Sequence, residues 1–243
     1  MKNEQAWQAT KFSTSGEQLS VGPAASAASW LITQLVAQAY QHHLPSHARG
    51  RLVDLGCGTV PLYGAYRPLV SEITCVDWSG NAGSAQHLDV AHDLNQPVPL
   101  DDNRYDTAIL SDVLEHIRQP EALLSEVARI LAPGGKLLLN VPFLYWLHEQ
   151  PHDYFRYSEH ALRSFIEQAG LRLLTLEGLG GAPEVLADVV GKHLSQVPLV
   201  GSLSARWLQR STWALANLPP VARALAPSRQ RFPMAYFLVA EKS

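Results

Sequence analysis

Acidic residues recur in the first half of the chain directly after short apolar stretches, and the first of them precedes a pair of glycines. The segment VDLGCG sets Asp54 just before the turn Gly56-Cys57-Gly58. Glycines admit backbone conformations closed to other residues and let a ligand approach the main chain. A helix beginning after the turn would present free N–H groups to an anion such as a carboxylate. The acid suits a ligand with an amino group better than a pyrophosphate, although a purely structural tight turn is the alternative.

A second acid, Asp77, ends the apolar segment EITCVD at roughly 20 residues past the glycines. An acid in this position can accept both ribose hydroxyls of a nucleoside. Trp78 follows at once and either lies against the adenine or ribose or is a partly buried core aromatic. A solvated strand-end acid is the alternative for Asp77.

Two further segments, LDVAHDLN and YDTAILSDVLEHI, carry polar residues after apolar runs. Asp93 is the preferred acceptor for an adenine amine, with Asp89 as its competitor. The second segment ends its apolar run at Ser111 and Asp112. In doubly wound sheets, ligands bind outside the carboxyl ends of the strands, so these residues are expected to meet at one site.

A dinucleotide cofactor is disfavoured by Pro61. The fingerprint G-x-G-x-x-G/A needs a small third residue for close packing of helix and strand. An NAD-dependent oxidoreductase is therefore a weaker hypothesis than a nucleoside-binding site. A non-catalytic binding module of the same fold remains an alternative.

The segment 143–157 gathers histidines, acids and aromatics and is predicted to be a loop over the site. His148 or His152 would serve as a general base, since histidine titrates near neutral pH, and Asp153 would orient the imidazole. An ordinary hydrogen-bonded loop is the alternative for each residue. We expect His116, further upstream, to be structural, at the start of a helix near the cofactor.

The letters HEQPH satisfy the metalloprotease pattern H-E-x-x-H, which needs both histidines on one helical face. Pro151 makes such a helix difficult, because proline removes a backbone donor and biases the preceding residue away from helix. No metal site is predicted.

Short apolar strands alternating with helices predict an α/β fold with a mostly parallel sheet covered on both faces. The expected strands are 51–55, 72–77, a weak 87–90, 105–110, 136–141, 171–176 and a closing strand at 232–240. The expected helices are 24–42, ended by Pro45 and Gly50, then 120–131, ended by APGG, then 158–169, and several within 183–226.

Composition limits the partners and the compartment. The 243 residues carry a formal net charge of −3, which gives no electrostatic argument for nucleic acid. The two cysteines form no disulfide framework, which favours a reducing compartment. No apolar run reaches the ~18 residues of a membrane span, and the first residues do not resemble a secretory signal. A cytoplasmic location is expected.

In order along the chain, VDLGCG, CVDWS, HDLNQPVP, YDTAILSDVLEHI and ILAPGGKLLLNVP resemble the class I S-adenosylmethionine-dependent methyltransferases of the type 11 group. The resemblance implies a doubly wound, seven-stranded, mostly parallel Rossmann-like sheet whose last strand is antiparallel and lies beside the fifth. It also implies roles for individual residues in holding S-adenosylmethionine. These are Gly56 and Gly58 along the methionine portion, Asp54 beside its amino group, Asp77 on the ribose, Asp93 and the Leu94 amide on adenine, and Ser111 and Asp112 near the sulfonium. The family often has glycine where this chain has Val60, which crowds the turn.

The organisation expected from these patterns is one methyltransferase domain over 1–243. Residues 1–22 would form an arm or lid, and 183–230 a helical insertion or cap before the last strand. The expected activity is O-methylation of a hydroxyl on a small molecule, lipid or glycan. The late helices, which combine Trp207 and Trp213 with Arg206 and Arg210, would pack on the core, contact a membrane surface or form a dimer interface. A monomer and a homodimer both remain open.

Overall fold

The computed structural model describes residues 1–80 and 86–243. In this part of the chain one sheet has seven strands in the order β5-β4-β3-β6-β7-β9-β8, and a second sheet is the hairpin β1-β2. The large sheet consists of β3 (Arg51–Leu55), β4 (Glu72–Asp77), β5 (Val90–Ala91), β6 (Tyr105–Ser111), β7 (Leu131–Pro142), β8 (Leu171–Leu179) and β9 (Ala235–Lys242).

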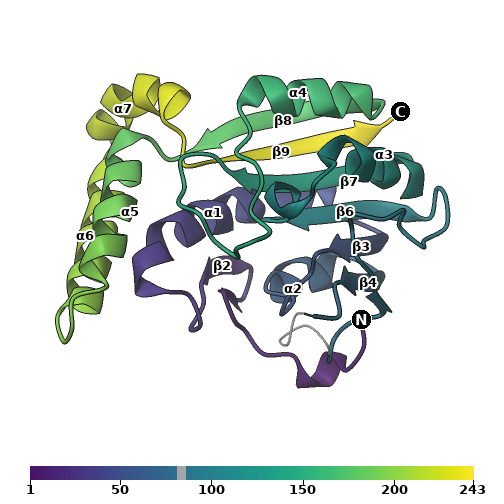
Figure 1. Ribbon diagram of the computed structural model, residues 1–243, viewed down its shortest axis with the longest axis horizontal. Helices are drawn as coiled ribbons and strands as arrows, with labels where there is room; N and C mark the ends of the chain where they lie inside the picture. Colours follow the sequence, from purple (N-terminus) through teal and green to yellow (C-terminus); the bar gives the residue numbers. More distant parts are fainter. Residues whose placement is uncertain (81–85) are drawn as a thin grey trace.

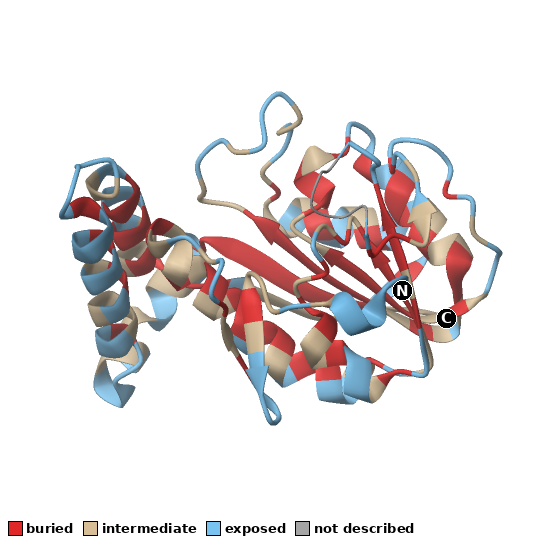
Figure 2. Cartoon of the chain, turned by 90° about the horizontal axis from the view of Figure 1, so that it is seen from below, coloured by how far each residue is buried: buried red, intermediate tan, exposed pale blue. Residues whose placement is uncertain are grey.

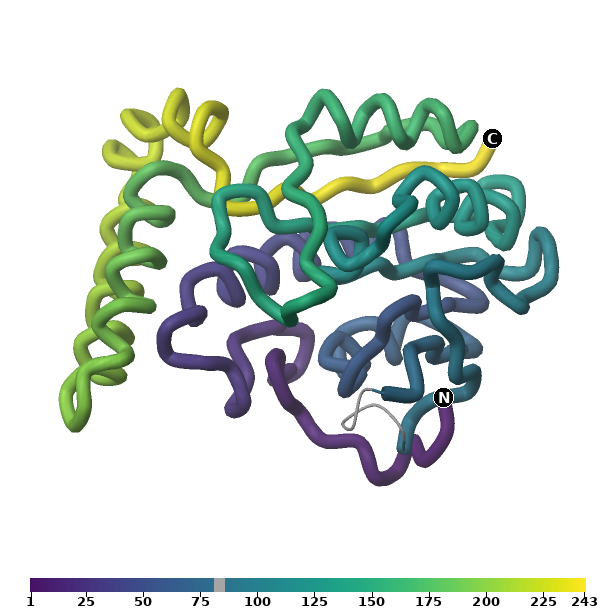
Figure 3. The backbone as a smooth tube through the Cα atoms, viewed as in Figure 1, coloured from purple at the N-terminus to yellow at the C-terminus, as the bar shows by residue number. Residues whose placement is uncertain are grey.

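The strand directions confirm the predicted fold. Strands β5, β4, β3, β6 and β7 pair in parallel, whereas β9 is antiparallel to both of its neighbours, β7 and β8. In Figure 3 the last segment of the chain (yellow) runs through the sheet between two earlier strands. The sheet is therefore the Rossmann-like arrangement expected from the sequence.

Apolar residues on both faces of the sheet explain why helices cover both sides (Figure 1). One buried cluster joins the sheet to α3 (Pro120–Ile130) and α4 (Glu159–Gln168). A second cluster joins the opposite face to α1 (Trp30–His47) and α2 (Tyr63–Tyr66). Strand β9 alternates between them, with Leu238 in the first cluster and Phe237 in the second. Near-continuous apolar strands are typical of such doubly covered sheets.

Helix α1 differs from its predicted bounds at both ends. It begins at Trp30, after the 3-10 turn η2 (Ala27–Ser29), and runs through Pro45 to His47. Proline removes one helical hydrogen bond, but here that loss falls in the last turn. Tyr40 and Leu44 are buried against the sheet side of the helix, so packing outweighs the local signal.

Three other predicted bounds change. The helix expected directly after the glycine turn is the single turn α2, which begins at Tyr63 and is continued by the 3-10 turn η3 (Arg67–Leu69). The weak third strand is β5, at Val90–Ala91, where it pairs with the end of β4. Strand β7 begins at Leu131, so APGG lies within a strand that shifts register against β6 rather than in a loop.

The polar opening segment is ordered against the body of the molecule. After the 3-10 turn η1 (Glu4–Ala6), β1 (Phe12–Ser15) and β2 (Gln18–Val21) form a hairpin that packs on α1. The Trp7 ring lies 4.9 Å from the Tyr63 ring, and its indole N–H donates to the Val60 carbonyl at 2.9 Å. A role for residues 1–22 as a lid stays a prediction.

Between β8 and β9 the chain forms α5 (Ala182–Leu194), α6 (Gly201–Ala216) and α7 (Pro219–Arg231). Helices α5 and α6 form a hairpin at one end of the molecule (Figure 1), anchored by Gln209, which accepts from Leu31 N–H at 2.8 Å. Figure 2 shows that much of this hairpin is exposed. Exposed apolar residues include Leu186, Val190, Leu199, Leu203 and Trp207. Within the described residues, no helix has the length and apolar character to cross a membrane.

The first prediction concerns the boundary between the 143–157 loop and α4. Ser158 caps α4 by accepting from Ala161 N–H at 3.3 Å. Ser158→Ala is expected to lower the free energy of unfolding by about 1 kcal/mol, measured by urea denaturation. Ser164→Ala, which removes an exposed hydroxyl from the same helix, is expected to change it by less than about 0.5 kcal/mol. Equal losses in both variants would contradict the capping role.

Candidate active site

A cleft of about 1340 Å³ lies beyond the carboxyl ends of β3, β4, β5 and β6. It exceeds the ~300–1,000 Å³ typical of small-molecule pockets, so it has room for a nucleoside and a second ligand. Nine of the ten residues predicted to hold the cofactor line it: Gly56, Cys57, Gly58, Asp77, Trp78, Asp93, Leu94, Ser111 and Asp112. Ligand sites of open α/β sheets are expected at this edge.

The glycine turn after β3 is held by backbone hydrogen bonds to the end of β4. Gly56 N–H donates to the Val76 carbonyl at 2.8 Å. Gly56 has a φ of 72°, and a Cβ there would meet Val113 at 2.5 Å, so no larger residue fits. Val60 has a φ of 54° and so keeps the left-handed conformation that glycine would favour, despite its branched side chain.

Asp77 joins this turn to the end of β4. Its Oδ2 accepts from Gly58 N–H at 2.7 Å, and its Oδ1 accepts from Trp78 N–H at 2.6 Å. The side chain is largely buried yet borders the cleft. Trp78 is 54% exposed, and its ring meets the His152 ring edge-on at 5.6 Å. Trp78 is therefore a cleft aromatic and not a core residue.

Asp93 and Asp89, the two candidate acceptors for the adenine amine, differ in their contacts and in whether they line the cleft. Asp89 accepts from Cys75 N–H at 2.8 Å and pairs with the Met1 amino group at 3.0 Å, and it does not line the cleft. Asp93 does, and its Oδ1 accepts from both the backbone and side-chain N–H groups of Asn95. The hydrogen bonds from Asn95 lower the pKa of Asp93, which keeps it ionised.

Asp112 is the centre of a polar chain at the end of β6. It has a φ of 54°, and its carboxylate accepts from Lys11 Nζ and from Asn140 Nδ2, each at 2.6 Å. Asn140 in turn accepts from the buried Tyr40 hydroxyl at 2.8 Å. Burial lowers the pKa of Lys11, but Asp112 outweighs this effect and raises it. Lys11 is therefore a cation on the cleft wall, and nothing in the sequence pattern singled it out.

Asp54 is the one predicted cofactor residue that does not line the cleft. It lies buried at the end of β3, where it accepts from the Tyr66 hydroxyl at 2.9 Å. Burial raises its pKa to about 7, and the nearby Asp77 adds to this shift. A place for Asp54 beside the cofactor amino group, as the resemblance implies, stays a prediction.

Cys57 lines the cleft, but the residue is almost fully buried. Its hydrogen bond with Cys75 and its burial raise the pKa of Cys57, so the thiol stays neutral. Both cysteines are buried and unbridged.

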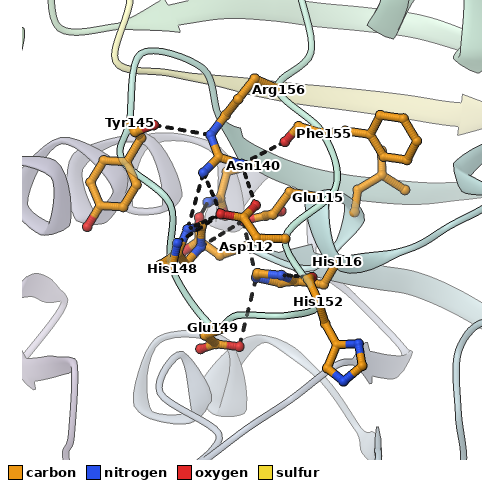
Figure 4. A network of polar contacts seen from close by, with 12 residues as sticks. Asp112, Glu115, His116, Asn140, Tyr145, His148, Glu149, His152, Phe155 and Arg156 are labelled. Atoms are coloured by element: carbon orange, nitrogen blue, oxygen red, sulfur yellow. Dashed lines mark hydrogen bonds and ion pairs between the residues drawn. The ribbon is translucent and has the colours of Figure 1, made fainter.

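Residues 143–157, all of which the structure describes, contain neither helix nor strand. This confirms the argument from Pro151 against a helical H-E-x-x-H site. Arg156 organises the loop by donating to the carbonyls of Tyr145 at 3.3 Å and Phe155 at 2.7 Å (Figure 4). It also donates to the Trp146 carbonyl at 2.8 Å. The loop reaches the cleft through Glu149, Gln150, His152 and Tyr154.

The three predicted catalytic residues separate in the structure. His152 lines the cleft, and its Nδ1 lies 3.0 Å from the Tyr154 hydroxyl. His148 and Asp153 lie behind the cleft wall, where His148 Nδ1 is 3.2 Å from Asp153 Oδ2. The hydrogen bonds from Arg156 hold the pKa of Asp153 at about 2. Asp153 thus orients His148 and not His152.

His116, Arg118 and Tyr154 also line the cleft. Arg118 Nε donates to the Tyr154 hydroxyl at 3.0 Å. Sequence reasoning placed His116 near the cofactor as a structural residue and gave Arg118 no role. These residues come together because the loop after β6 meets the loop after β7. No local sequence pattern predicts that contact.

A model of the family described as a methyltransferase domain matches residues 31–176. The chain belongs to this family. Its members are class I S-adenosylmethionine-dependent methyltransferases, as the sequence resemblance implied. The matched region begins in α1 and ends in β8, so it contains every strand end that borders the cleft.

Individual relatives are more distant. A ubiquinone biosynthesis O-methyltransferase of Coxiella burnetii is 26% identical over 154 residues. That match covers 53% of this chain and 66% of the relative, so this chain spans slightly less than two thirds of the relative's length. A SAM-dependent methyltransferase of Archaeoglobus fulgidus has a TM-score of 0.55 at 17% identity, covering 90% of this chain and 95% of that one. One from Mesorhizobium loti has a TM-score of 0.53 at 17% identity, covering 88% and 97%. These structures share the fold.

The second prediction follows from Asp54. The pKa of Asp54 in the folded state, about 7, lies above the ordinary value of 3.8 for an aspartate, so the native state binds the proton more tightly than the unfolded state. Between these values, stability falls as pH rises, by up to about 4 kcal/mol, and the loss is complete above pH ~7.

Asp54→Asn keeps an acceptor for Tyr66 but cannot ionise. It is expected to be more stable than the wild type at pH 8 and to lose this advantage towards pH 4. Urea denaturation of the cofactor-free protein across this range checks the difference. If the free energy of unfolding changed with pH in the same way in both proteins, Asp54 would not be the cause of the pH dependence.

Proposed function

We propose that this chain transfers a methyl group from S-adenosylmethionine to the oxygen of a hydroxyl on a small molecule, lipid or glycan. The observation that carries the proposal is the meeting of the glycine turn, Asp77, Asp93 and Asp112 around one large cleft. Membership of the methyltransferase-domain family supports the same activity. The oxygen acceptor has weaker support, from the name of the Coxiella burnetii relative.

The residues around the cleft fit this cofactor better than a dinucleotide. Five carboxylates line the cleft, Asp77, Asp93 and Asp112 among them, and they would repel a pyrophosphate but not a sulfonium or an amino group. Gly58 has open space where a Cβ would stand, so its backbone is accessible to a ligand. The roles that the resemblance implies are kept as proposals: Gly56 and Gly58 along the methionine portion, Asp77 on the ribose, Asp93 and the Leu94 N–H on adenine, and Ser111 and Asp112 near the sulfonium. Trp78 is proposed to lie against the nucleoside because it directly follows Asp77 and lines the cleft.

In this proposal the protein aligns the acceptor and removes its proton. The bound cofactor supplies a methyl group that is already activated on a sulfonium. His152 is the preferred base because it is the predicted catalytic histidine that lines the cleft. Lys11 lines the cleft and forms an ion pair with Asp112. This contact places part of the N-terminal segment at the cleft and supports the proposal that residues 1–22 form a lid.

Calorimetry of the purified chain tests cofactor identity. S-adenosylmethionine is expected to bind and NADH is not. Mass spectrometry of hydroxylated candidate acceptors incubated with the protein then tests transfer, as a gain of one methyl group. Cofactor binding without transfer to any acceptor class would favour the non-catalytic module, and NADH binding alone would favour an oxidoreductase.

The third prediction concerns Asp77. Asp77→Ala removes the expected ribose acceptor and also the anchor of Gly58, and is expected to weaken S-adenosylmethionine binding by about 1–3 kcal/mol, roughly 5- to 150-fold. Calorimetry gives the dissociation constant. Asp101→Ala, at a strongly exposed carboxylate away from the cleft, is the matched control and should bind normally. Unchanged affinity in Asp77→Ala would remove Asp77 from the site.

The fourth prediction concerns the base. His152→Ala is expected to lower turnover by about 10²- to 10⁴-fold while leaving cofactor affinity nearly unchanged. The assay uses an acceptor that the wild type methylates, and a calorimetric titration provides the affinity. His160→Ala, at an exposed histidine of α4, is the control. Full activity of His152→Ala would exclude it as the base.

A further inference from the structure

At the wall of the cleft, which His116 lines, two loops bring together three side chains that can all act as electron-pair donors. Glu115 and His116 belong to the 3-10 turn η4 (Leu114–His116) after β6, and His148 belongs to the loop after β7. One carboxylate oxygen and one nitrogen from each ring all lie within 4.8 Å of one another. Figure 4 shows the three side chains gathered in one network.

Glu115 is the unusual member of this group. Its side chain is fully buried, and among the described residues neither carboxylate oxygen has a hydrogen-bond partner. Two imidazole nitrogens, His148 Nε2 at 3.6 Å and His116 Nε2 at 3.8 Å from Glu115 Oε1, are beyond hydrogen-bonding distance. A buried carboxylate without a partner is costly, and such a group points to an ion or another bound species.

The two histidines have their other ring nitrogens engaged. His116 Nδ1 lies 2.7 Å from the His152 carbonyl, which can only accept, so this nitrogen carries the proton. His148 Nδ1 lies 3.2 Å from Asp153 Oδ2, and Arg156 Nη2 donates to the same oxygen at 2.8 Å. Arg156 Nη2 is also 3.4 Å from His148 Nδ1, a longer contact than its bond to Asp153. With the proton on Nδ1 of each neutral ring, both Nε2 atoms are free to act as ligands, and they lie 3.6 Å and 3.8 Å from Glu115 Oε1.

This arrangement resembles a cation site in which each histidine ligand is oriented by a hydrogen bond from its second ring nitrogen. Histidine ligands commonly donate their second nitrogen to a carboxylate or a backbone carbonyl, which orients the ring. Two donors bound ~2.1 Å from one tetrahedral cation lie roughly 3.4 Å apart. The separations of 3.6 Å and 3.8 Å from Glu115 Oε1 are close to this value, and all three donor atoms lie within 4.8 Å of one another.

We propose that Glu115, His116 and His148 bind a divalent transition-metal cation of the zinc class. Two imidazole nitrogens and one carboxylate suit zinc and cobalt better than magnesium, calcium or manganese, which prefer oxygen ligands. Glu149 Oε2 lies 3.8 Å from His116 Nε2 and is mostly exposed, so it can supply a fourth ligand or give way to one. His116 and Glu149 both line the cleft, so the remaining position faces the acceptor.

The role of the cation rests on the proposed function. A cation at the cleft wall polarises a hydroxyl oxygen of the acceptor and lowers the pKa of that hydroxyl. The oxygen then attacks the methyl carbon, the carbon–sulfur bond breaks, and the hydroxyl proton passes to His152. The site therefore favours acceptors with a hydroxyl beside a second oxygen that can also reach the cation.

The experiment uses the full chain after treatment with a chelator. Zinc chloride is titrated by calorimetry, and cobalt(II) is added separately while its visible absorption is recorded. We expect one equivalent of zinc to bind and cobalt(II) to give the intense bands of a low-coordinate site with nitrogen and oxygen ligands. Glu115→Gln and His148→Gln should each weaken zinc binding by at least 10-fold, whereas His160→Gln, at an exposed histidine, should not.

Asp153→Asn adds a variant that leaves all three ligands intact. It should weaken zinc binding by about 10- to 100-fold through the orientation of His148. Wild-type protein that binds no zinc, or ligand variants that are folded by circular dichroism and bind zinc like the wild type, would overturn the site.

A parallel titration with S-adenosylmethionine separates this proposal from the proposed function. Cofactor binding without zinc binding overturns the cation site alone. Zinc binding that depends on Glu115 and His148 without cofactor binding supports the site and overturns the methyltransferase proposal.

Discussion

The carboxylate of Asp77 is the interaction on which the cleft depends. Its two oxygens accept from Gly58 N–H and Trp78 N–H, so a single side chain ties the glycine turn after β3 to the end of β4. Gly56 N–H and Cys57 N–H, bonded to the Val76 carbonyl, complete the connection. The turn can be tight because glycine occupies the positions where a Cβ would collide or the backbone is left-handed.

A second connection closes the other wall of the cleft. Asp112 sits between Lys11 of the N-terminal segment and Asn140 of β7, so three distant parts of the chain meet at one carboxylate. Charge-assisted hydrogen bonds of this kind are stronger than neutral ones, and Asn140 and Tyr40 continue the chain into the core. The N-terminal hairpin is in this way part of the cleft and not a free tail.

The loop after β7 is held by charge in place of regular secondary structure. Arg156 bonds to Asp153 and to carbonyls along the loop, and Asp153 bonds to His148 N–H at 2.8 Å. Burial raises the pKa of Glu115, since its carboxylate lies out of solvent beneath this loop. Burial alone would lower the pKa of His148, but the nearby carboxylates of Glu115 and Asp153 have the larger effect, so the pKa is raised.

The sequence by itself determined the α/β class, the buried strands and the antiparallel last strand, because apolar runs and glycine turns are local signals that also fit a known family. The sequence also identified nine residues that line the cleft, because residues that follow parallel strands lie together at one edge of the sheet. Only the tertiary structure separated Asp54 from the cleft wall, brought Lys11 to Asp112, and set His148 against Glu115 and not beside His152. Those outcomes depend on the path of two loops and on burial, and neither is encoded in a local pattern.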